Sequence, residues 1–502
     1  MALVVMALPL GLSGAERINH EGRILGAVPV VTNAILFNTP EADAVMSALQ
    51  VFPRDNAWNE DISLRPLLAN SDAMIRHIYT NLDAARRTLR AFKEMNFVIV
   101  PDNQPLVPID FWYAPDESDP SPYPIPPNLP VETWPSEAMG LSLYDWQRDI
   151  NGDGGDRHAI VVQPGLGHTY ETWSTLMVVA NNQTNWQAAN GAKFSLTNNA
   201  LRPLYWTSGD AAGLSMLGGL VRFDECERGM VEHAIRLVVR ITRHAFIYPA
   251  THRAGATSDT NAPAMGQRLR LRSSFVISNS WTLQEKAVLK ALKKYGALVA
   301  DNGNFFSISV VPDQRWPVNA FNNLSRYLSV TNFEVIQTTG PNEGPRSPGA
   351  PVVFAGVDRT VSPGETINLQ GTVQYTNVAP VATAWRLYSG PDGIVFGNTN
   401  QTNTTASFPA PGTYTLMLSA DDGVHTVAYD AVVITAQEPI RLTVSRNGPA
   451  VSLRWAGGRA PYQLEQAAEL TPAAWTSILT TSGTNATLPL SAGTKFFRVR
   501  AD

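Results

Sequence analysis

Cysteine is almost absent from the sequence, and this excludes a disulfide-stabilised fold. The 502 residues contain one cysteine, Cys226, and a single thiol cannot close an intramolecular disulfide. Scarcity of thiols is typical of proteins exported to an oxidising compartment, where an unpaired thiol is a hazard. The acidic neighbours Glu225 and Glu227 disfavour a thiolate, so we expect Cys226 to be a small buried hydrophobe rather than a nucleophile.

Charge is also scarce, and no strongly basic segment is present. Charged residues make up 16% of the chain, and the formal net charge is −5. Nucleic-acid binders need clustered positive charge, so we expect no nucleic-acid partner. No segment has the ~18 uninterrupted apolar residues of a transmembrane helix, so no membrane span is expected. Hydrophobic residues make up 44%, enough to build the cores of about two to four domains.

The N-terminus, MALVVMALPLGLSGAE, is a short apolar run followed by small residues. Ser13 and Ala15 stand where a signal-peptide cleavage site has small side chains, although the positively charged start of such a peptide is missing. We predict that residues 1–15 are a signal peptide and that the protein is secreted or held at the cell surface. The alternative is a disordered apolar N-terminus.

Glycine and proline mark the main domain boundary. The stretch 338–351, TTGPNEGPRSPGAP, lacks large apolar residues and predicts an exposed linker. It separates an N-terminal domain at 25–337 from two C-terminal modules, 352–437 and 438–502. The softer boundary between these modules lies near Gln437-Glu438-Pro439.

Residues 352–437 show short alternating segments separated by turns, which is typical of a β-sandwich. We expect Trp385 to be a core residue and Asp422-Gly423 to form a hairpin turn. The pattern resembles a PKD-type Ig-like domain, and the resemblance implies an Ig-like sandwich. It is carried by Trp385, Ser389-Gly390-Pro391, Phe408, Gly412-Thr413-Tyr414 and Ala420-Asp421-Asp422-Gly423.

The last module, 438–502, reads as a second small β domain. Its pattern resembles a C-terminal repeat of secreted proteins from Verrucomicrobia-like bacteria, which implies a spacer or a surface-binding unit. The residues that carry the resemblance are Trp455, Tyr462 to Glu465, Trp475 and Phe496 to Val499.

The N-terminal domain mixes helical and strand patterns. We predict a helix over 71–95 with Ser71 or Asp72 as N-cap, a helix over 281–295, and a third beginning near Glu227. In the second helix, Thr282 and Glu285 have the spacing of a capping box. Much of the rest reads as strands, including FVIVP, HAIVVQ, AFIYP, RLRLRSSFVIS and ALVADNG. The predicted fold is therefore a β-rich α+β domain, a sandwich or barrel with helices packed on it, followed by two all-β Ig-like modules.

No nucleophile elbow, P-loop, HExxH zinc motif or dinucleotide fingerprint is present. Carboxylates are nevertheless dense between residues 202 and 301, and two carboxylates on either side of a sugar bond can hydrolyse it. The candidates are Asp210, Asp224, Glu225 and Asp301, of which Asp301 also fits a simple turn.

Histidines offer a second chemistry. His233 and His252 are candidates for a catalytic base, and with His158 they could supply three ligands to a metal ion. No ligand spacing pattern joins them, and scattered histidines are more often structural.

Two groups of residues suit a sugar ligand. Trp173 and Trp206 offer flat amphipathic rings to sugar faces, or anchor loops in the core. Arg268, Arg270 and Arg272 alternate along one predicted strand face, where they either bind a ligand or pair with carboxylates on a solvated sheet.

A weaker pattern suggests calcium. Asp149, Asn151 and Asp153 place oxygen ligands at alternate positions, as in the first half of a calcium loop. Ile160 stands where the bidentate glutamate is needed, so the alternatives are an acidic turn or a calcium ion with ligands from elsewhere.

Most of 50–335 resembles an uncharacterised family of secreted bacterial proteins, which implies no particular activity. The matching stretches are Trp206–Leu214, Gly219–Glu225, Pro249–His252, Met265–Leu271, Leu289–Gly296 and Leu298–Gly303. We expect a monomeric, secreted glycoside hydrolase that acts on a polysaccharide through a carboxylate pair. The alternatives are a non-catalytic glycan-binding or adhesion protein and a histidine-based metal enzyme.

Overall fold

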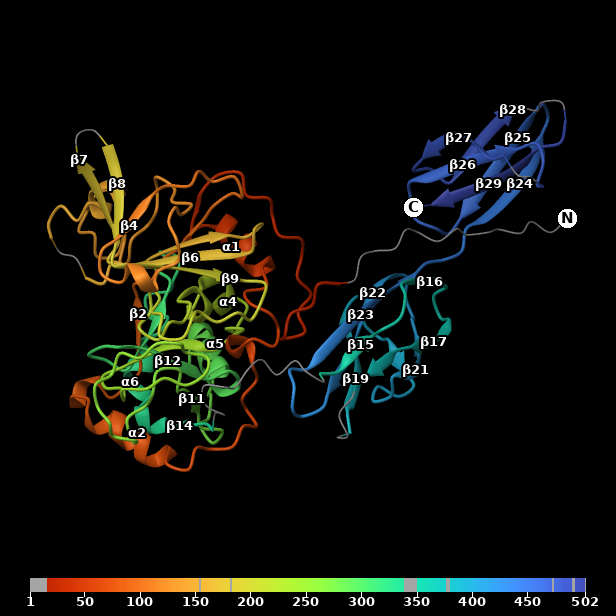
Figure 1. Ribbon diagram of the computed structural model, residues 1–502. Coiled ribbons are helices and arrows are strands. Elements are labelled where there is room, and N and C mark those ends of the chain that lie inside the picture. The colour runs from red at the N-terminus through yellow and green to blue at the C-terminus, as the bar shows by residue number, and fades with distance from the viewer. Residues whose placement is uncertain are drawn as a thin grey trace. The chain divides into compact units, whose positions relative to one another are not determined.

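The computed structural model describes residues 16–152, 155–180, 183–337, 350–375, 380–471, 474–489 and 493–501. The chain divides into two compact units, one spanning Asn19–Pro348 and the other formed mainly by Gly349–Asp502 (Figure 1). The predicted signal peptide, 1–15, and most of the predicted linker, 338–351, lie outside the described residues.

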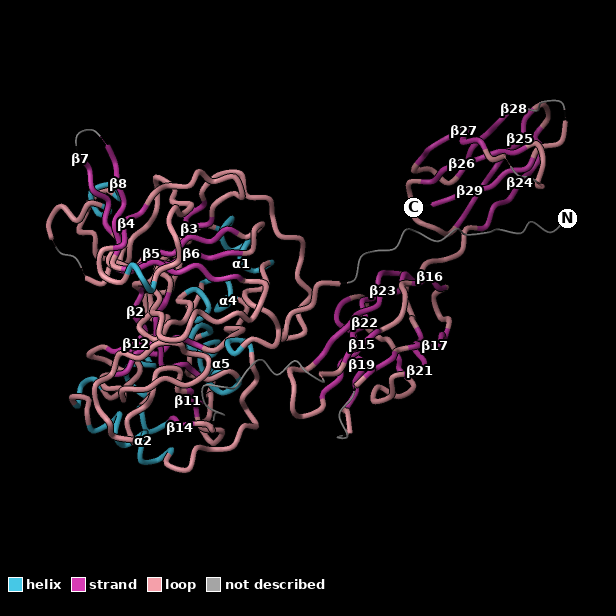
Figure 2. The backbone as a smooth tube through the Cα atoms, viewed as in Figure 1, coloured by secondary structure: helices cyan, strands magenta, loops and turns pink. Residues whose placement is uncertain are grey.

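Three sheets form the strand framework of the N-terminal unit (Figure 2). The five-stranded sheet contains, in spatial order, β1 (Ile35–Leu36), β3 (Val98–Ile99), β5 (Ala159–Gln163), β6 (His168–Trp173) and β9 (Asn190–Ser195). The six-stranded sheet contains β14 (Phe333–Val335), β11 (Arg268–Leu271), β12 (Ala297–Asn302), β10 (Ile235–Val239), β13 (Ser307–Val310) and β2 (Arg90–Lys93). A smaller sheet contains β4 (Ile109–Phe111), β8 (Gln183–Ala188) and β7 (Leu176–Ala180).

The central strands of the six-stranded sheet are buried on both faces. All four residues of β11 and of β13 are buried, as are four of the five residues of β10. Runs of this kind are typical of sheets with covered faces, and two neighbouring pairs here, β10–β12 and β13–β2, are parallel. The β-rich part of the predicted fold class is therefore confirmed.

The ladder between β10 and β12 contains an irregularity that bears on the candidate site. Leu237 pairs with Val299, but the next residue, Val238, pairs with Asp301. Ala300 is the extra residue of a β-bulge, a feature that locally breaks the pairing and re-aims side chains. Its carbonyl accepts a hydrogen bond from the backbone N–H of Ala212, 2.9 Å away.

The helices of this unit are short. They are α1 (Pro40–Ala48), α2 (Ser71–Thr80), α3 (Leu143–Gln147), α4 (Phe223–Glu227), α5 (Leu283–Lys294) and α6 (Asn322–Tyr327). Single 3₁₀ turns are η1 (Ala57–Asn59), η2 (Ala84–Arg86), η3 (Pro115–Glu117), η4 (Leu217–Gly219) and η5 (Val330–Asn332). The predicted capping box at Thr282 and Glu285 is confirmed at the start of α5.

Two helix predictions were wrong in extent. The helix predicted over 71–95 ends at Thr80, where the Asn81 side chain donates to the His77 carbonyl, and its N-cap is Asn70. Residues 90–93 instead form β2, because pairing with β13 outweighs local helix propensity. The helix predicted to begin near Glu227 ends there, as α4, so His233 lies in a loop before β10.

The first C-terminal module is a β-sandwich. Its sheets contain β16 (Arg359–Val361), β23 (Ala428–Ala436), β22 (Gly412–Asp421) and β19 (Ala382–Ser389), then β17 (Thr366–Gln370), β21 (Asn403–Ser407) and β20 (Val395–Phe396), then β15 (Val352–Phe354) and β18 (Thr372–Gln374). Trp385 is buried in the core, as predicted. The Tyr414 hydroxyl donates to the Ala410 carbonyl at 2.8 Å, a tyrosine-corner contact found in Ig-like folds.

The Asp422-Gly423 pair lies in the loop that joins the antiparallel strands β22 and β23, where the hairpin turn was predicted. The buried Asp422 carboxylate accepts the backbone N–H groups of Val424 and His425 and pairs with the His425 ring, which organises the loop. The remaining strands form two three-stranded sheets, β24 (Arg441–Asn447), β25 (Ala450–Ala456) and β28 (Asn485–Pro489), and β27 (Thr476–Thr481), β26 (Tyr462–Ala467) and β29 (Phe496–Ala501).

Candidate functional site

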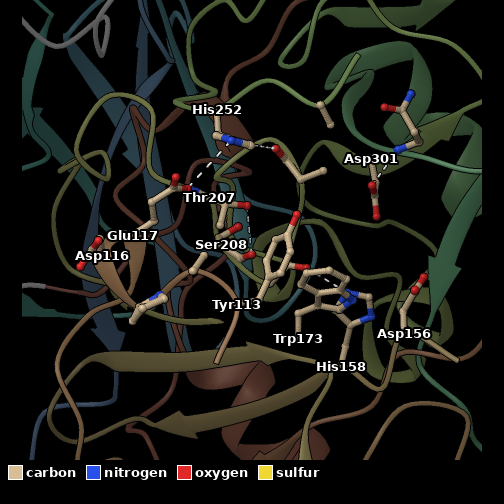
Figure 3. Close-up of a pocket in the computed structure, with 16 residues that line it drawn as sticks. Tyr113, Asp116, Glu117, Asp156, His158, Trp173, Thr207, Ser208, His252 and Asp301 are labelled. Carbon is tan, nitrogen blue, oxygen red and sulfur yellow. Dashed lines mark hydrogen bonds and ion pairs between the residues drawn. The ribbon is translucent and has the colours of Figure 1, made fainter. Parts of the chain in front are cut away.

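A cavity of about 610 Å³ in the N-terminal unit gathers several of the polar residues that the sequence singled out. Its walls come from the loop after β4, from η3, and from the chain at the ends of β6 and β12 (Figure 3). We call it the first cavity. Its lining residues with chemically active or aromatic side chains are Tyr113, Asp116, Glu117, Asp156, His158, Trp173, Thr207, Ser208, His252 and Asp301.

Asp301 enters the cavity from the end of β12. Its Oδ2 accepts a hydrogen bond from Arg236 Nη2 at 3.0 Å, and its Oδ1 accepts the backbone N–H of Asn302 at 2.7 Å. The side chain keeps 22% of its surface exposed. Asp301 is therefore a carboxyl group that meets solvent on one side and a buried cation on the other.

Asp210 lies behind Asp301 and holds the same cation more tightly. Its side chain is completely buried and receives Arg236 Nε at 3.0 and 2.9 Å and Nη2 at 2.6 Å. Paired contacts of this kind are the strongest that a guanidinium makes with a carboxylate. Asp210 was predicted as a catalytic candidate, but it does not line the cavity.

Because Asp210 also binds Arg236, the positive charge of Arg236 only partly offsets the effect of burial on Asp301. Burial raises the pKa of Asp301, Arg236 lowers it, and the negative charge of Asp210 raises it again, so that the pKa is about 6. A carboxyl group in this range keeps its proton in mildly acidic solution and can donate it to a bound substrate.

His158 is charged for a geometric reason. Its Nδ1 lies 2.8 Å from Glu132 Oε2 and its Nε2 lies 2.9 Å from the Gly209 carbonyl, so both ring nitrogens face acceptors and both must donate. Burial opposes this charge, but Glu132 raises the pKa of His158 to about 9. An imidazolium has no lone pair for a metal, so His158 cannot serve in the three-histidine site considered above.

Glu94 completes the buried charge cluster. Its Oε1 accepts the Ser309 hydroxyl at 2.9 Å, and Ser309 Oγ accepts Arg236 Nη1 at 2.9 Å. Burial and the nearby Glu132 raise the pKa of Glu94 to about 7. Asp210 pairs with Arg236, and Glu132 pairs with His158, so each buried cation has one carboxylate partner. Asp301 and Glu94 are the two remaining carboxyl groups of the cluster, and both have a raised pKa.

His252 stands across the first cavity from Asp301 (Figure 3). Its Nδ1 donates to the Ala211 carbonyl at 2.7 Å, which leaves Nε2 as the acceptor nitrogen of the neutral ring. Nε2 lies 4.0 Å from Glu117 Oε2. His252 is therefore the one of the three candidate histidines that is available for proton transfer.

Aromatic rings continue from the cavity wall to its rim. Trp173 meets Tyr113 edge to face at 5.7 Å, and Tyr113 meets Trp112 at 5.8 Å. Tyr113 and Trp112 are 66% and 60% exposed, which leaves their faces open for sugar rings. Trp206, the other predicted aromatic, lies beside the Arg202 guanidinium instead, 5.6 Å from it, and does not line the cavity.

Three predicted catalytic residues lie elsewhere, in a charge network around α4. Glu225 pairs with Arg222 at 2.8 Å and with His233 at 3.2 Å, and Asp224 pairs with Arg228 at 2.8 Å. Although burial opposes ionisation, Arg222 and His233 hold the pKa of Glu225 at about 2. Asp224, Glu225 and His233 are buried ion-pair partners outside the cavity. The neighbouring Cys226 is buried, as predicted, and its thiol pKa is raised by burial.

The predicted arginine row does not form a ligand surface. Arg268 donates to the Tyr295 carbonyl, and Arg270 pairs with Glu334 at 2.6 Å and donates to loop carbonyls at 2.8 Å. Both are buried because their sheet face is covered rather than solvated. Arg272 lies beyond the end of β11 and pairs with exposed Asp72 at 3.0 Å.

The calcium prediction is only partly within the described residues. Asp149 Oδ1 lies 3.5 Å from Arg157 Nη1, Asn151 is exposed, and Asp153 lies outside the described residues. Within the described ranges, no group of three histidine, cysteine or acidic side chains could hold a metal ion.

Comparisons with known proteins identify one domain of this chain. Residues 355–436 match a family model that describes a PKD domain, so the predicted PKD domain is confirmed. No curated protein matches the chain. PKD and Ig-like domains are typical of extracellular proteins. Within the described part of the chain, no helix has the length and hydrophobicity needed to cross a membrane.

Solved structures similar to this chain include PKD and immunoglobulin domains. The PKD domain of the KIAA 1837 protein is 23% identical over 17% of this chain and 83% of that one, with a TM-score of 0.15. The PKD domain of human KIAA0319 is 20% identical over 22% of this chain and 100% of that one, with a TM-score of 0.18. Immunoglobulin domains 1–4 of Sidekick-1 are 15% identical over 30% and 48% of the two chains, with a TM-score of 0.19.

Proposed function

We propose that the N-terminal unit is an extracellular enzyme that hydrolyses glycosidic bonds in the first cavity, with Asp301 as the general acid. The observation that carries this proposal is the sharing of Arg236 between Asp301 and the completely buried Asp210. Burial and the charge of Asp210 raise the pKa of Asp301 to about 6 although Arg236 lowers it, so a carboxyl group that faces the cavity holds a proton in mildly acidic solution. The rings of Trp173 and the mostly exposed Tyr113, which line the cavity, support a sugar ligand.

The proposed reaction uses two carboxyl groups of the first cavity. Protonated Asp301 donates its proton to the glycosidic oxygen while the bond from that oxygen to the anomeric carbon breaks. A water molecule attacks the anomeric carbon and gives a proton to the second carboxylate. This base must lie across the sugar ring from Asp301. Asp156 and Glu117, which also line the cavity, are our candidates for it. The base then releases its proton to solvent, and Asp301 regains a proton.

Reducing-sugar release from a panel of polysaccharides by the full chain tests the proposal. The panel includes glucans, mannans, xylans and N-acetylated glycans, with polygalacturonate and alginate as anionic members. Asp156→Asn and Glu117→Gln decide which carboxylate is the base, since only the base variant is expected to lose turnover. An inactive full chain on every member of such a panel would count against the proposal.

The pH dependence of hydrolysis follows from the raised pKa of Asp301. The acid must be protonated, so kcat/KM is expected to fall as the pH rises through about 6, approaching a loss of about tenfold per pH unit. Initial rates between pH 4 and 9 measure this limb. An activity that is flat up to pH 8 would remove Asp301 from the role of acid.

A second candidate function is glycan binding without catalysis, which the open aromatic rim favours. Trp112 and Tyr113 are mostly exposed, and they continue the ring surface of Trp173 out of the cavity. Under either function, Trp173→Ala is expected to weaken oligosaccharide binding about 10-fold or more, because stacking on one ring is lost. Isothermal titration calorimetry measures this loss, and Trp475→Ala in the C-terminal module is the matched control.

A further inference from the structure

A second cavity adjoins the first one in the N-terminal unit. Its volume is also about 610 Å³, and it is lined by Glu94, Glu132, Thr133, Glu137, Met139, Trp146, Gly155, Asp156 and Arg157. Asp156 lines both cavities. The two cavities are also linked by an ion pair, since His158, which lines the first, pairs with Glu132, which lines the second. Each volume falls in the range of about 300–1,000 Å³ that ligand sites have.

The first cavity also has exposed aromatic rings at its rim. Tyr113, which lines the cavity, and the neighbouring Trp112 continue the row of rings from Trp173 into solvent. Asp301 and Asp156 therefore have a second ligand-sized space beside Asp156 and exposed rings at the rim of the first cavity. A pocket for a chain end is instead closed on one side of the reacting groups.

From the shared residue Asp156 and the exposed rings at the rim we infer that a linear polysaccharide runs from the aromatic rim through the first cavity and past Asp156 into the second cavity, so that the enzyme cuts it internally. The inference rests on the proposed function for the cut itself. It adds a further binding site for sugar units in the second cavity.

The charges of both cavities indicate which class of polysaccharide they bind. Exposed or partly exposed carboxylates line the first cavity at Asp116 and Glu117 and the second at Glu137, with Asp156 between them. The buried cations do not offset them, because each has a carboxylate of its own: His158 faces Glu132, and Arg157 lies 3.5 Å from Asp149. A chain of uronic acids is repelled here, whereas neutral sugars offer hydroxyl donors to carboxylates. The substrate class is therefore a neutral linear polysaccharide.

The binding test uses full-length Asp301→Asn and neutral β-1,4-linked glucose, mannose, xylose and N-acetylglucosamine oligomers of two to six units, measured by calorimetry. Affinity for the recognised series is expected to rise with length beyond three units. Adding Glu137→Trp, which fills the second cavity from an exposed position, is expected to weaken hexamer binding at least 10-fold and to leave the trimer unchanged. Glu41→Trp, an exposed glutamate of α1 outside both cavities, is the matched control.

The product test follows the wild-type full chain on the polysaccharide of the recognised series. Internal cutting predicts an early fall in viscosity and a ladder of long oligomers. Release of only mono- or disaccharides from the start, or hexamer binding that Glu137→Trp leaves unchanged, overturns the inference, and so does preferred cutting of polygalacturonate. Length-dependent binding that Glu137→Trp abolishes, without any cleavage, supports the second binding site and refutes the hydrolytic function instead.

Discussion

Asp301→Asn is expected to lower kcat/KM for polysaccharide hydrolysis by about 10²–10⁴-fold, the contribution typical of a general acid. The amide cannot donate the proton. It retains the size of the carboxyl, but its single acceptor oxygen keeps only one of the two hydrogen bonds that Asp301 accepts from Arg236 and Asn302. Oligosaccharide binding is expected to remain within a few-fold of the wild type. Reducing-sugar release and calorimetry on the same preparation separate the two effects. Asp72→Asn changes an exposed carboxylate far from the cavity lining and is the matched control.

The same variant also gives a stability readout that excludes unfolding as the cause. The folded-state pKa of Asp301 is raised from 3.8 to about 6, so its contribution to stability is fully present below pH 3.8 and is lost as the pH rises through 6. Since asparagine does not ionise, the wild type is expected to lose stability relative to Asp301→Asn as the pH rises through about 6. A stability difference between the two proteins that stays constant across this pH range would contradict this account of the site.

Arg236→Met is expected to destabilise the N-terminal unit by about 3–5 kcal/mol at pH 7, because it leaves the completely buried Asp210 carboxylate without its cation. Hydrogen–deuterium exchange of peptides covering β10 and β12 measures the effect within this unit. The double variant Asp210→Asn with Arg236→Met is expected to recover much of the loss, since no charge then remains unpaired.

Arg272→Met is the matched control for this experiment. Arg272 also pairs with an aspartate, Asp72, but their side chains are 35% and 82% exposed, and exposed pairs contribute at most about 1 kcal/mol. Equal protection losses in the two arginine variants would mean that the Asp210 pair is not a buried ion pair in solution.

Local signals made part of the fold predictable. The capping box at Thr282 and the alternating strands of the PKD domain depend on residues that are close in sequence, and both were found where expected. The end of α2 was missed because β2 forms only through its distant partner β13. Glu94, which follows β2, was therefore placed on a predicted helix and not among the candidate site residues.

The candidate site was harder to predict from the sequence than the fold. Asp301, Trp173 and His252 line the first cavity, whereas Asp224, Glu225 and His233 form a separate charge network. The sequence placed all of these residues except Trp173 in one polar stretch, and only tertiary contacts separate the two groups. Glu132 and Asp156 lie far upstream of that stretch, in loops that carry no recognisable motif.

The β-bulge at Ala300 determines two parts of the site together. Side chains alternate between the faces of a strand, so removing one residue from β12 would turn Asp301 to the opposite face of the sheet. The bulge also frees the Ala300 carbonyl to hold Ala212, two residues after Asp210. One extra residue in β12 therefore sets both the direction of the proposed acid and the anchor of its buried partner.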